Sequence, residues 1–376
     1  MLRPNNLAAF DQTRHSPPFL CLQQALPGRQ LRDYCVPVNP YFPTAAMFRV
    51  FRDRLEEVLK YYPASNAEVG RVLAEGLGLD PETVVLANGS TELLTWIDVL
   101  LVRPSLATPV PTFGRWTDHP LELGKELHAY ALRADDDFHL DVADFVRFVR
   151  ARQVRAIALC NPNNPTGALQ SRDEVLFLFD ALADLDVVVI DESFLDFADE
   201  QGVATVSAEA ARRDNVIVLK SLGKNFGLHG VRAGYAVANP RLAATLRRAL
   251  PHWNVNGLAE LLIREFPRHL AEYEVSRRRV IQDRVYLEGR LGSVAGLTVY
   301  PSRANFVYLR VPAEIDGTEL RNGLLTEHGM LVRECGNKVG SDRNHFRVAA
   351  RPRDQVDQLI DAMTAVLSPG RLRPAF

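Results

Sequence analysis

The sequence predicts an α/β fold, in which helices on both faces cover a mostly parallel sheet and a smaller α+β domain follows. Two observations predict it. Between residues 82 and 240, apolar segments of strand length alternate with segments of helical periodicity. Several of the apolar segments are continuous, as expected for strands that are buried on both faces. With 376 residues, 47% of them hydrophobic, the chain is long enough for a large core and a companion domain.

Three segments are expected along the chain. Residues 1–44 lack clear periodicity and contain Pro37, Pro40 and Pro43, which predicts an extended N-terminal arm that joins the small domain. Residues 45–267 form the predicted large domain, and residues 268–376 form the small C-terminal domain. No internal repeat or low-complexity tract interrupts this order.

The elements of the large domain follow from periodicity and from the glycines and prolines that end each segment. Helices are predicted at 48–62, 67–79, 90–102, 141–152 and 172–185. Strands are predicted at 82–89, 107–113, 126–132, 154–162, 186–193, 215–222 and 232–240. In the small domain we expect a long helix at 268–291, strands within 297–311 and 345–352, and a closing amphipathic helix at 352–367.

Composition excludes several classes of protein. The net charge of −2 gives no reason to expect a nucleic acid or an anionic membrane as partner. Four scattered cysteines and nine unclustered histidines disfavour a disulfide framework and a metal site. No apolar segment is long enough to span a membrane, and the polar N-terminus lacks the apolar core of a signal peptide, so we expect a cytoplasmic protein.

Polar residues follow four of the predicted strands, and in open α/β sheets ligands bind at the carboxyl ends of strands. Gly89, Ser90 and Thr91 begin a helix, where backbone amides can hold a phosphate, although a simple helix cap would look the same. The turn Asn161–Gly167 and the carboxylate of Asp191 follow two buried strands. The ordinary explanation for the first feature is a turn whose shape is set by its prolines. For Asp191, the ordinary explanation is an N-cap or a salt bridge.

The segment 215–235, NVIVLKSLGKNFGLHGVRAGY, carries the most specific chemistry. Its strand delivers Ser221 and Lys224 into a glycine-rich turn, and Arg232 follows eight residues after the lysine. An amine that can form a Schiff base, next to a hydroxyl and a guanidinium that can hold a phosphate, suits a phosphate-bearing aldehyde. Taken alone, Lys224 could also be an ordinary surface lysine and Arg232 a salt-bridge partner.

Together, these elements resemble the fold-type I, pyridoxal-phosphate-dependent aminotransferases of class I and II. The resemblance rests on Gly89-Ser90-Thr91, Phe113, the NPNNPTG turn, Asp191-Glu192 and the SxxK motif with Arg232. It covers nearly the whole chain beyond the N-terminal arm and is greatest with the histidinol-phosphate aminotransferase branch. That branch includes the related L-threonine-O-3-phosphate decarboxylases.

The resemblance implies pyridoxal 5'-phosphate as cofactor, with Lys224 as the residue that forms the Schiff base and moves protons at the substrate Cα. It implies that Asp191 keeps the pyridine nitrogen protonated and that Asn164 donates to the phenolic oxygen. Phe113 would stack on the ring. The cofactor phosphate would be held by Gly89, Ser90, Thr91, Ser221 and Arg232.

Further positions match residues that bind the substrate or the partner subunit. Tyr62 matches a tyrosine that reaches the cofactor phosphate across the interface of a homodimer. Arg347 matches the arginine that binds the substrate's anionic group, a bidentate task suited to a guanidinium. The other matches to the substrate pocket are Asn39, Asn305 and Arg333.

Two positions depart from the histidinol-phosphate aminotransferase pattern. Phe194 stands where a tyrosine is usual and cannot hydrogen-bond the phenolic oxygen of the cofactor, but phenylalanine is typical of the decarboxylase branch. Gly223 replaces a serine or threonine before the lysine and so removes one phosphate donor.

The leading hypothesis is an aminotransferase that moves an amino group between an amino acid or amine and a 2-oxo acid. The alternative is a decarboxylase, or an elimination or cyclisation enzyme, that acts on a phosphorylated or phosphonate amino acid. A DNA-binding regulator is disfavoured because neither end has a helix-turn-helix pattern. A nicotinamide-dependent dehydrogenase is disfavoured because no GxGxxG motif follows a strand.

Overall fold

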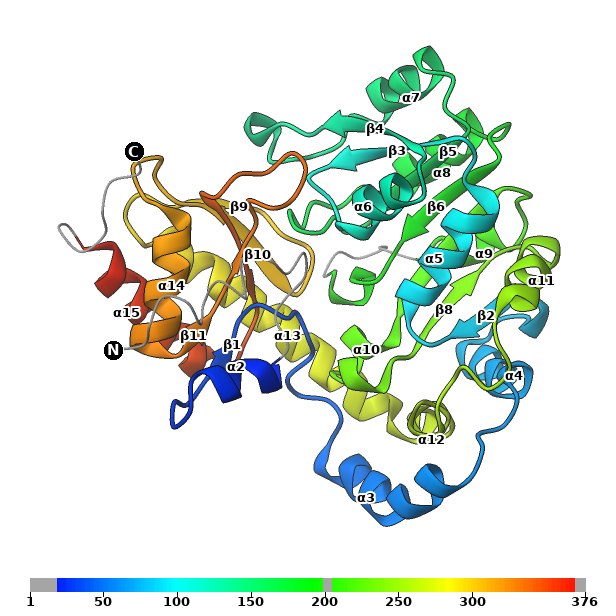
Figure 1. Ribbon diagram of the computed structural model, residues 1–376, viewed down its shortest axis with the longest axis horizontal. Coiled ribbons are helices and arrows are strands. Elements are labelled where there is room, and N and C mark those ends of the chain that lie inside the picture. Colours follow the sequence, from blue (N-terminus) through cyan, green and yellow to red (C-terminus); the bar gives the residue numbers. More distant parts are fainter. Residues whose placement is uncertain (1–18, 199–204, 369–376) are drawn as a thin grey trace.

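The computed structural model describes residues 19–198 and 205–368. It contains a large part built on a central sheet and a smaller part built on an antiparallel sheet. The long helix α13 (Leu270–Gly292) runs from beneath the large part into the smaller one (Figure 1). This arrangement confirms the predicted α/β fold class.

The central sheet has seven strands in the order β2-β8-β7-β6-β5-β3-β4. Their bounds are β2 (Val84–Ala87), β3 (Ser105–Val110), β4 (Glu126–Ala131), β5 (Ala156–Cys160), β6 (Val187–Asp191), β7 (Val216–Ser221) and β8 (Gly234–Val237). The strands β4, β3, β5, β6 and β7 are parallel, whereas β8 is antiparallel to both of its neighbours. Because β2 is antiparallel to β8, it runs in the same direction as these five strands, and the carboxyl ends of six strands meet at one edge of the sheet.

Helices cover both faces of this sheet, as the continuous apolar strands predicted. Along β6, Val187 and Val189 face one core while Val188 and Ile190 face the other, because successive side chains point to opposite faces. The first core is completed by α5 (Ser90–Leu101), α6 (Arg115–Glu122) and α11 (Pro240–Ala249). The second core is completed by α7 (Val142–Ala151), α8 (Arg172–Ala181) and α9 (Ser207–Ala210).

A further core lies beside β2 and β8, and its three helices carry apolar residues toward these strands. They are α3 (Ala45–Lys60), α4 (Asn66–Leu77) and α12 (Gly257–Glu265). Each begins with an N-cap side chain that accepts a hydrogen bond from the first turn. The short helix α10 (Leu222–Asn225) directly follows β7 and carries Lys224.

The smaller part contains a four-stranded antiparallel sheet in the order β12-β13-β10-β9. Its strands are β9 (Thr298–Tyr300), β10 (Phe306–Arg310), β12 (Arg333–Glu334) and β13 (His345–Ala349). The helices α14 (Gly317–His328), α15 (Arg353–Leu367) and α13 pack on it through a single apolar core.

The N-terminal segment packs against the smaller part, where β1 (Arg32–Asp33) pairs in parallel with β11 (Met330–Leu331). Figure 1 shows this pair beside α2 (Phe19–Ala25). The expectation of a wholly extended arm is wrong for residues 19–25, because Leu22 and Leu26 bury one face of α2 against Leu325 and Leu331. Residues 1–18 of the predicted arm lie outside the described residues.

Besides α2 and the four-residue helices α9 and α10, four of the described helices were absent from the expected elements. Helix α6 contains Pro120, and α14 contains Gly323 in its interior. Helix α11 follows the N-cap Asn239 with Pro240 at its first position, a start signal that the predicted strand 232–240 concealed. The fourth is α12, which begins at Gly257. Within the described ranges, no helix is long and apolar enough to cross a bilayer.

Candidate active site

A cavity of about 480 Å³ lies between the large and small parts, at the edge where the parallel strands end. Most of the predicted site residues line it. They are Gly89, Ser90, Thr91, Phe113, Asn164, Ser221, Lys224, Arg232, Arg333 and Arg347. A larger cavity, of about 730 Å³, lies near Trp253 and contains none of the predicted site residues.

Gly89 is positioned against the guanidinium of Arg232. It is the N-cap of α5 with φ +86°, and a Cβ added to it would lie only 2.6 Å from Arg232 Nη2. The neighbouring Gly234 is equally restricted, because an added Cβ would lie 2.3 Å from the backbone nitrogen of Ser90. Two glycines thus let the first amides of α5, the strand β8 and Arg232 approach one another, which suits a phosphate at a helix N-terminus.

Lys224 lies in the cavity between two aromatic rings. Its Nζ is 4.8 Å from the ring centroid of Phe194 and 5.9 Å from that of Phe113. Burial lowers the pKa of Lys224 below its usual range, and Arg347 and Arg232 lower it further, against the opposing effect of Asp191. A lysine with a lowered pKa supplies the neutral amine that Schiff-base chemistry needs.

Asp191 ends β6 behind the cavity and is 7% exposed. One carboxylate oxygen accepts a hydrogen bond from the indole nitrogen of Trp116 at 3.4 Å, and the other accepts one from the backbone nitrogen of Ser193 at 3.1 Å. Beside it, burial and the charge of Asp191 raise the pKa of the Cys160 thiol to about 12, so this thiol stays protonated. The carboxylate is therefore held in place by donors on two elements.

Asn164 and Arg347 form a buried pair that joins the two parts of the molecule. Arg347 Nη1 donates to Asn164 Oδ1 at 2.7 Å, and Arg347 Nη2 donates to the carbonyl of Cys35 at 2.7 Å. Because a guanidinium can only donate, this contact fixes the amide so that its NH2 group is free to donate elsewhere. The side chain of Asn164 thus presents a donor at the cavity, as expected for a ligand of a phenolic oxygen.

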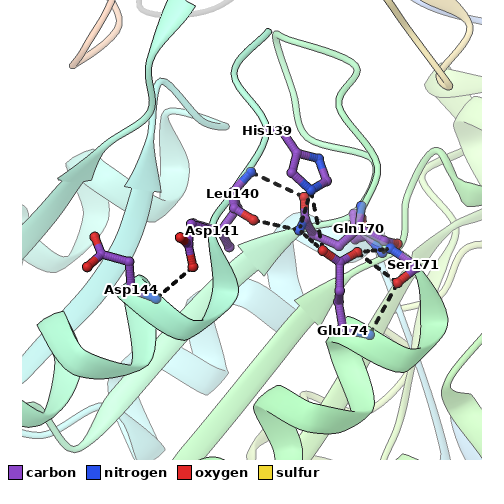
Figure 2. Close-up of polar contacts among 8 residues, drawn as sticks. His139, Leu140, Asp141, Asp144, Gln170, Ser171 and Glu174 are labelled. Atoms are coloured by element: carbon purple, nitrogen blue, oxygen red, sulfur yellow. Dashed lines mark hydrogen bonds and ion pairs between the residues drawn. The ribbon is translucent and has the colours of Figure 1, made fainter. Parts of the chain in front are cut away.

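The turn that carries Asn164 is held rigidly from both sides. Asn163 Nδ2 donates to the carbonyl of Pro111 at 2.9 Å, and the amide of Arg303 donates to the carbonyl of Gly167 at 2.8 Å. After the turn, Gln170 exchanges hydrogen bonds with the backbone of Leu140, and the capping box that begins α8 follows directly (Figure 2). These contacts explain why the polar turn is buried at the end of β5.

Four predicted residues do not line the cavity. Asn39 is buried, and its Nδ2 donates to the carbonyl of Asn225 and to Ser276 Oγ. Asn305 is fully buried and its side-chain atoms have no hydrogen-bond partner in the described protein. These placements give neither asparagine a direct contact with the cavity. Asp191 lies behind the cavity, as described above.

Tyr62 lies outside the cavity as well. Its side chain is 80% exposed and stacks on Trp253, with 4.7 Å between the ring centroids. A role at this site would require a second copy of the chain, so the predicted contribution across a dimer interface stays a prediction.

Several residues of the site were not singled out from the sequence. Lys338 lines the cavity, and its Nζ donates to the carbonyl of Thr112 at 2.8 Å. His229 also lines it, and burial together with Lys224 and Arg232 lowers its pKa to about 3, so the imidazole is neutral. Lys338 and Trp116 carry no local motif, and only the fold shows their proximity to the site.

The sequence profile described as aminotransferase class I and II matches residues 43–363. The chain belongs to this family. L-serine phosphate decarboxylase from Sulfurospirillum multivorans is 32% identical over 364 residues, which cover 94% of this chain and 93% of the relative. The solved structure of a decarboxylase from the same organism has a TM-score of 0.87 and 30% identity, covering 97% of this chain and 96% of the other.

A more distant member of the fold is the histidinol-phosphate aminotransferase from Sinorhizobium meliloti, solved in complex with pyridoxal 5'-phosphate. It has a TM-score of 0.83 and 20% identity, with 95% of this chain and 96% of the other covered. Family membership confirms the predicted cofactor, pyridoxal 5'-phosphate. The comparisons also confirm the resemblance on which the residue roles were based.

The residues present fit this cofactor. Because Gly89 has no Cβ, the guanidinium of Arg232 can lie close to the N-terminus of α5. No side chain caps the first amides of α5, so they stay available to an anion. Lys224 supplies the amine, Asp191 a fixed carboxylate, and Asn164 an oriented amide donor. Which of these residues contacts which group of the cofactor stays a prediction, supported by the chemistry of their side chains.

Proposed function

We propose that this enzyme is a pyridoxal-phosphate-dependent decarboxylase of an amino acid that carries a phosphate or phosphonate group. The observation that carries the proposal is the charge of the cavity. Among the described residues that line it are six basic side chains and no carboxylate: Arg115, Lys224, Arg232, Arg333, Lys338 and Arg347. An anionic cofactor and an anionic substrate can neutralise such a set.

The charges are distributed over two regions of the cavity. Arg232 lies with Gly89 at the start of α5, where the resemblance places the cofactor phosphate. Arg333 and Arg347 are direct partners across the antiparallel strands β12 and β13. Like charges at directly opposite positions repel one another, so this pair favours a second anion between or beside them.

Each side chain has a defined task in such a reaction. Bound pyridoxal phosphate supplies an electron sink for the electrons released when a bond to the substrate Cα breaks. Asp191, fixed by Trp116, would stabilise a protonated ring nitrogen. Arg347 holds an anionic group of the substrate, and because it also holds Asn164, binding and amide orientation are linked.

Lys224 is the group that we propose to move a proton at the substrate Cα. Its pKa is lowered by burial, which makes the neutral amine more readily available as a general base. Phe194 packs edge-on against Phe306 with 5.0 Å between the ring centroids, and it presents an apolar ring 4.8 Å from Lys224 Nζ. This ring offers no hydrogen bond to the cofactor, which leaves Asn164 as the neutral donor at the phenolic oxygen.

The choice of decarboxylation over transamination rests on similarity. The relative at 32% identity is a decarboxylase of a phosphorylated amino acid, and Phe194 is typical of the decarboxylase branch. The comparisons therefore support the alternative hypothesis from the sequence better than the leading one. Aminotransferase activity on a phosphate-bearing substrate is the second candidate, and the family itself supports it.

The test is incubation of the cofactor-loaded enzyme with O-phospho-L-serine, O-phospho-L-threonine and a phosphonate amino acid. Carbon dioxide and amine products are quantified together with 2-oxo acids, and unphosphorylated L-serine serves as the matched control. The proposal predicts carbon dioxide and amine in equal amounts from at least one phosphorylated substrate and little from serine. Production of a 2-oxo acid with conversion of the cofactor to its amino form, and without carbon dioxide, would establish the aminotransferase instead.

From the resemblance we also propose a cytoplasmic homodimer in which Tyr62 reaches the partner's cofactor site. The exposed stack of Tyr62 on Trp253 supports this proposal, because a large exposed aromatic pair is typical of an interface. Sedimentation analysis of the wild type tests whether the chain forms a dimer. The same analysis of Tyr62→Phe, together with its activity, tests the role of Tyr62. A monomer with full activity would contradict both.

A further inference from the structure

We propose that Lys338 is a specificity-determining residue that binds the phosphate or phosphonate group of the substrate. This inference rests on the proposed function and names the residue that binds one chemical group of the proposed substrate. Lys338 lies in the loop between β12 and β13, the two strands that carry Arg333 and Arg347. All three cationic side chains line the same cavity.

The loop fixes the position of the lysine. Its backbone makes a turn in which the amide of Lys338 donates to the carbonyl of Cys335 and that of Ser341 donates to the carbonyl of Lys338. At Gly340, with φ +81°, an added Cβ would lie 3.0 Å from Val110 Cγ2, so the loop packs directly on the end of β3. Ser341 Oγ is hydrogen-bonded to the hydroxyl of Tyr308 at 2.8 Å.

Lys338 therefore reaches the cavity from the small part and contacts the large part. Its Nζ donates to the carbonyl of Thr112, directly before Phe113. An ammonium has three protons to donate, and a neutral carbonyl leaves its charge uncompensated. Within residues 19–198 and 205–368, no carboxylate forms an ion pair with Lys338. A partly buried ammonium without a carboxylate is a poor structural element and a good anion ligand.

The charges around it identify which anion it serves. The pKa of Lys338 is lowered to about 8, chiefly by burial, with further lowering by Arg347 and Arg333 and an opposing effect of the thiols of Cys335 and Cys160. The arginines that act on it belong to β12 and β13, on the substrate side, whereas Arg232 lies beside Gly89. We therefore assign Lys338 to the anionic group of the substrate and not to the cofactor phosphate.

The test measures anion binding directly. Inorganic phosphate is titrated calorimetrically into the cofactor-loaded wild type and into Lys338→Gln, Lys338→Arg and Arg147→Gln. Arg147 is an exposed cation on α7 that does not line the cavity, and its replacement matches the change of charge. We expect Lys338→Gln to weaken phosphate binding about 10- to 100-fold, the loss expected for one charge-assisted hydrogen bond. Lys338→Arg should recover most of it, and Arg147→Gln should match the wild type.

Kinetics give a second, independent readout with O-phospho-L-serine. Lys338→Gln should raise KM about as much as it weakens phosphate binding, while kcat changes by less than about threefold, because the lysine is assigned to binding and not to bond breaking. The affinity for pyridoxal phosphate should stay at the wild-type value. Equal losses for cofactor and inorganic phosphate would overturn the assignment to the substrate.

The result that overturns the inference is a correctly folded Lys338→Gln protein with wild-type affinity for inorganic phosphate. If Lys338→Gln does not fold, Lys338→Met, which approximately keeps the length of the side chain, takes its place in the test. Calorimetry with inorganic phosphate requires no turnover. An enzyme that releases no carbon dioxide but loses phosphate affinity in Lys338→Gln would therefore contradict the proposed reaction and support the role of Lys338.

Discussion

Replacing Gly89 with alanine tests whether the contact between Gly89 and Arg232 holds the cofactor phosphate. The backbone of Gly89, at φ +86° and ψ 157°, lies in a region open essentially to glycine, so alanine costs about 1–3 kcal/mol of stability. The new Cβ would also lie 2.6 Å from Arg232 Nη2 and 3.1 Å from Cζ. The guanidinium must therefore move away from its place beside α5.

The expected loss of cofactor affinity follows from that movement. A hydrogen bond between charged groups is worth about 1.5–3 kcal/mol, so displacement of Arg232 should raise the Kd for pyridoxal phosphate about 10- to 100-fold. The assay is fluorescence or absorbance titration of the apoenzyme with the cofactor, together with urea unfolding of both proteins. Unfolding separates the effect on backbone strain from the effect on affinity.

Gly124→Ala is the matched control. Gly124 has φ +71°, and no atom lies within 4 Å of a Cβ added there, so alanine introduces strain without a clash. It should lose about 1–2 kcal/mol of stability and keep the wild-type cofactor affinity. If Gly89→Ala weakened cofactor binding equally in wild-type and Arg232→Ala backgrounds, the effect would not pass through Arg232 and the reasoning would be refuted.

Three further predictions concern the lysines. Lys224→Ala should lose the borohydride-stable cofactor adduct and at least about 1,000-fold in kcat, as measured by mass spectrometry and turnover; a retained adduct would identify a different amine. Lys220→Met should lower the free energy of unfolding by about 3–5 kcal/mol in urea, because Glu192, 2.8 Å from Lys220 Nζ, would stay buried without its partner. Phosphate affinity of the wild type should fall as the pH rises through about 8, because Lys338 loses its proton there, whereas Lys338→Arg should show no such fall; equal profiles by calorimetry would exclude Lys338 as the titrating group.

The prediction of pH dependence follows from the sign of the shift. The pKa of Lys338 is lowered, chiefly by burial and then by Arg347 and Arg333, so the ammonium is fully present only below about pH 8. A bound phosphate dianion stabilises the charged form and raises this pKa, which means that binding and protonation favour one another. Affinity is therefore greatest below the pKa of the free enzyme and decreases above it.

Local patterns were sufficient for most of the large part. Continuous apolar strands are recognisable because both of their faces are buried, and the polar residues that end β5, β6 and β7 stand out against them. The same patterns placed Asn164, Ser221 and Lys224 at one edge of a parallel sheet, where the structure brings them together. The cofactor followed from this combination of residues, and family membership confirms it.

Sequence alone did not determine which side chains reach the cavity from distant elements. β8 is antiparallel because its partners, β2 and β7, are chosen by packing, and no local signal gives that direction. Asn39 and Asn305 match positions of a substrate pocket, yet both are buried and neither lines the cavity. Such outcomes depend on how the small part packs on the large one.

At the site itself, Lys224 and Lys338 show the same difference between what local sequence patterns predict and what only the tertiary structure shows. The role of Lys224 was predicted from its own motif together with Gly89, Asn164 and Asp191, each of which lies at or after the end of a strand that local patterns predict. The role of Lys338 depends on a contact with Thr112, more than 200 residues earlier in the chain. Only tertiary structure brings such residues together, because burial and charge act through space and not along the sequence.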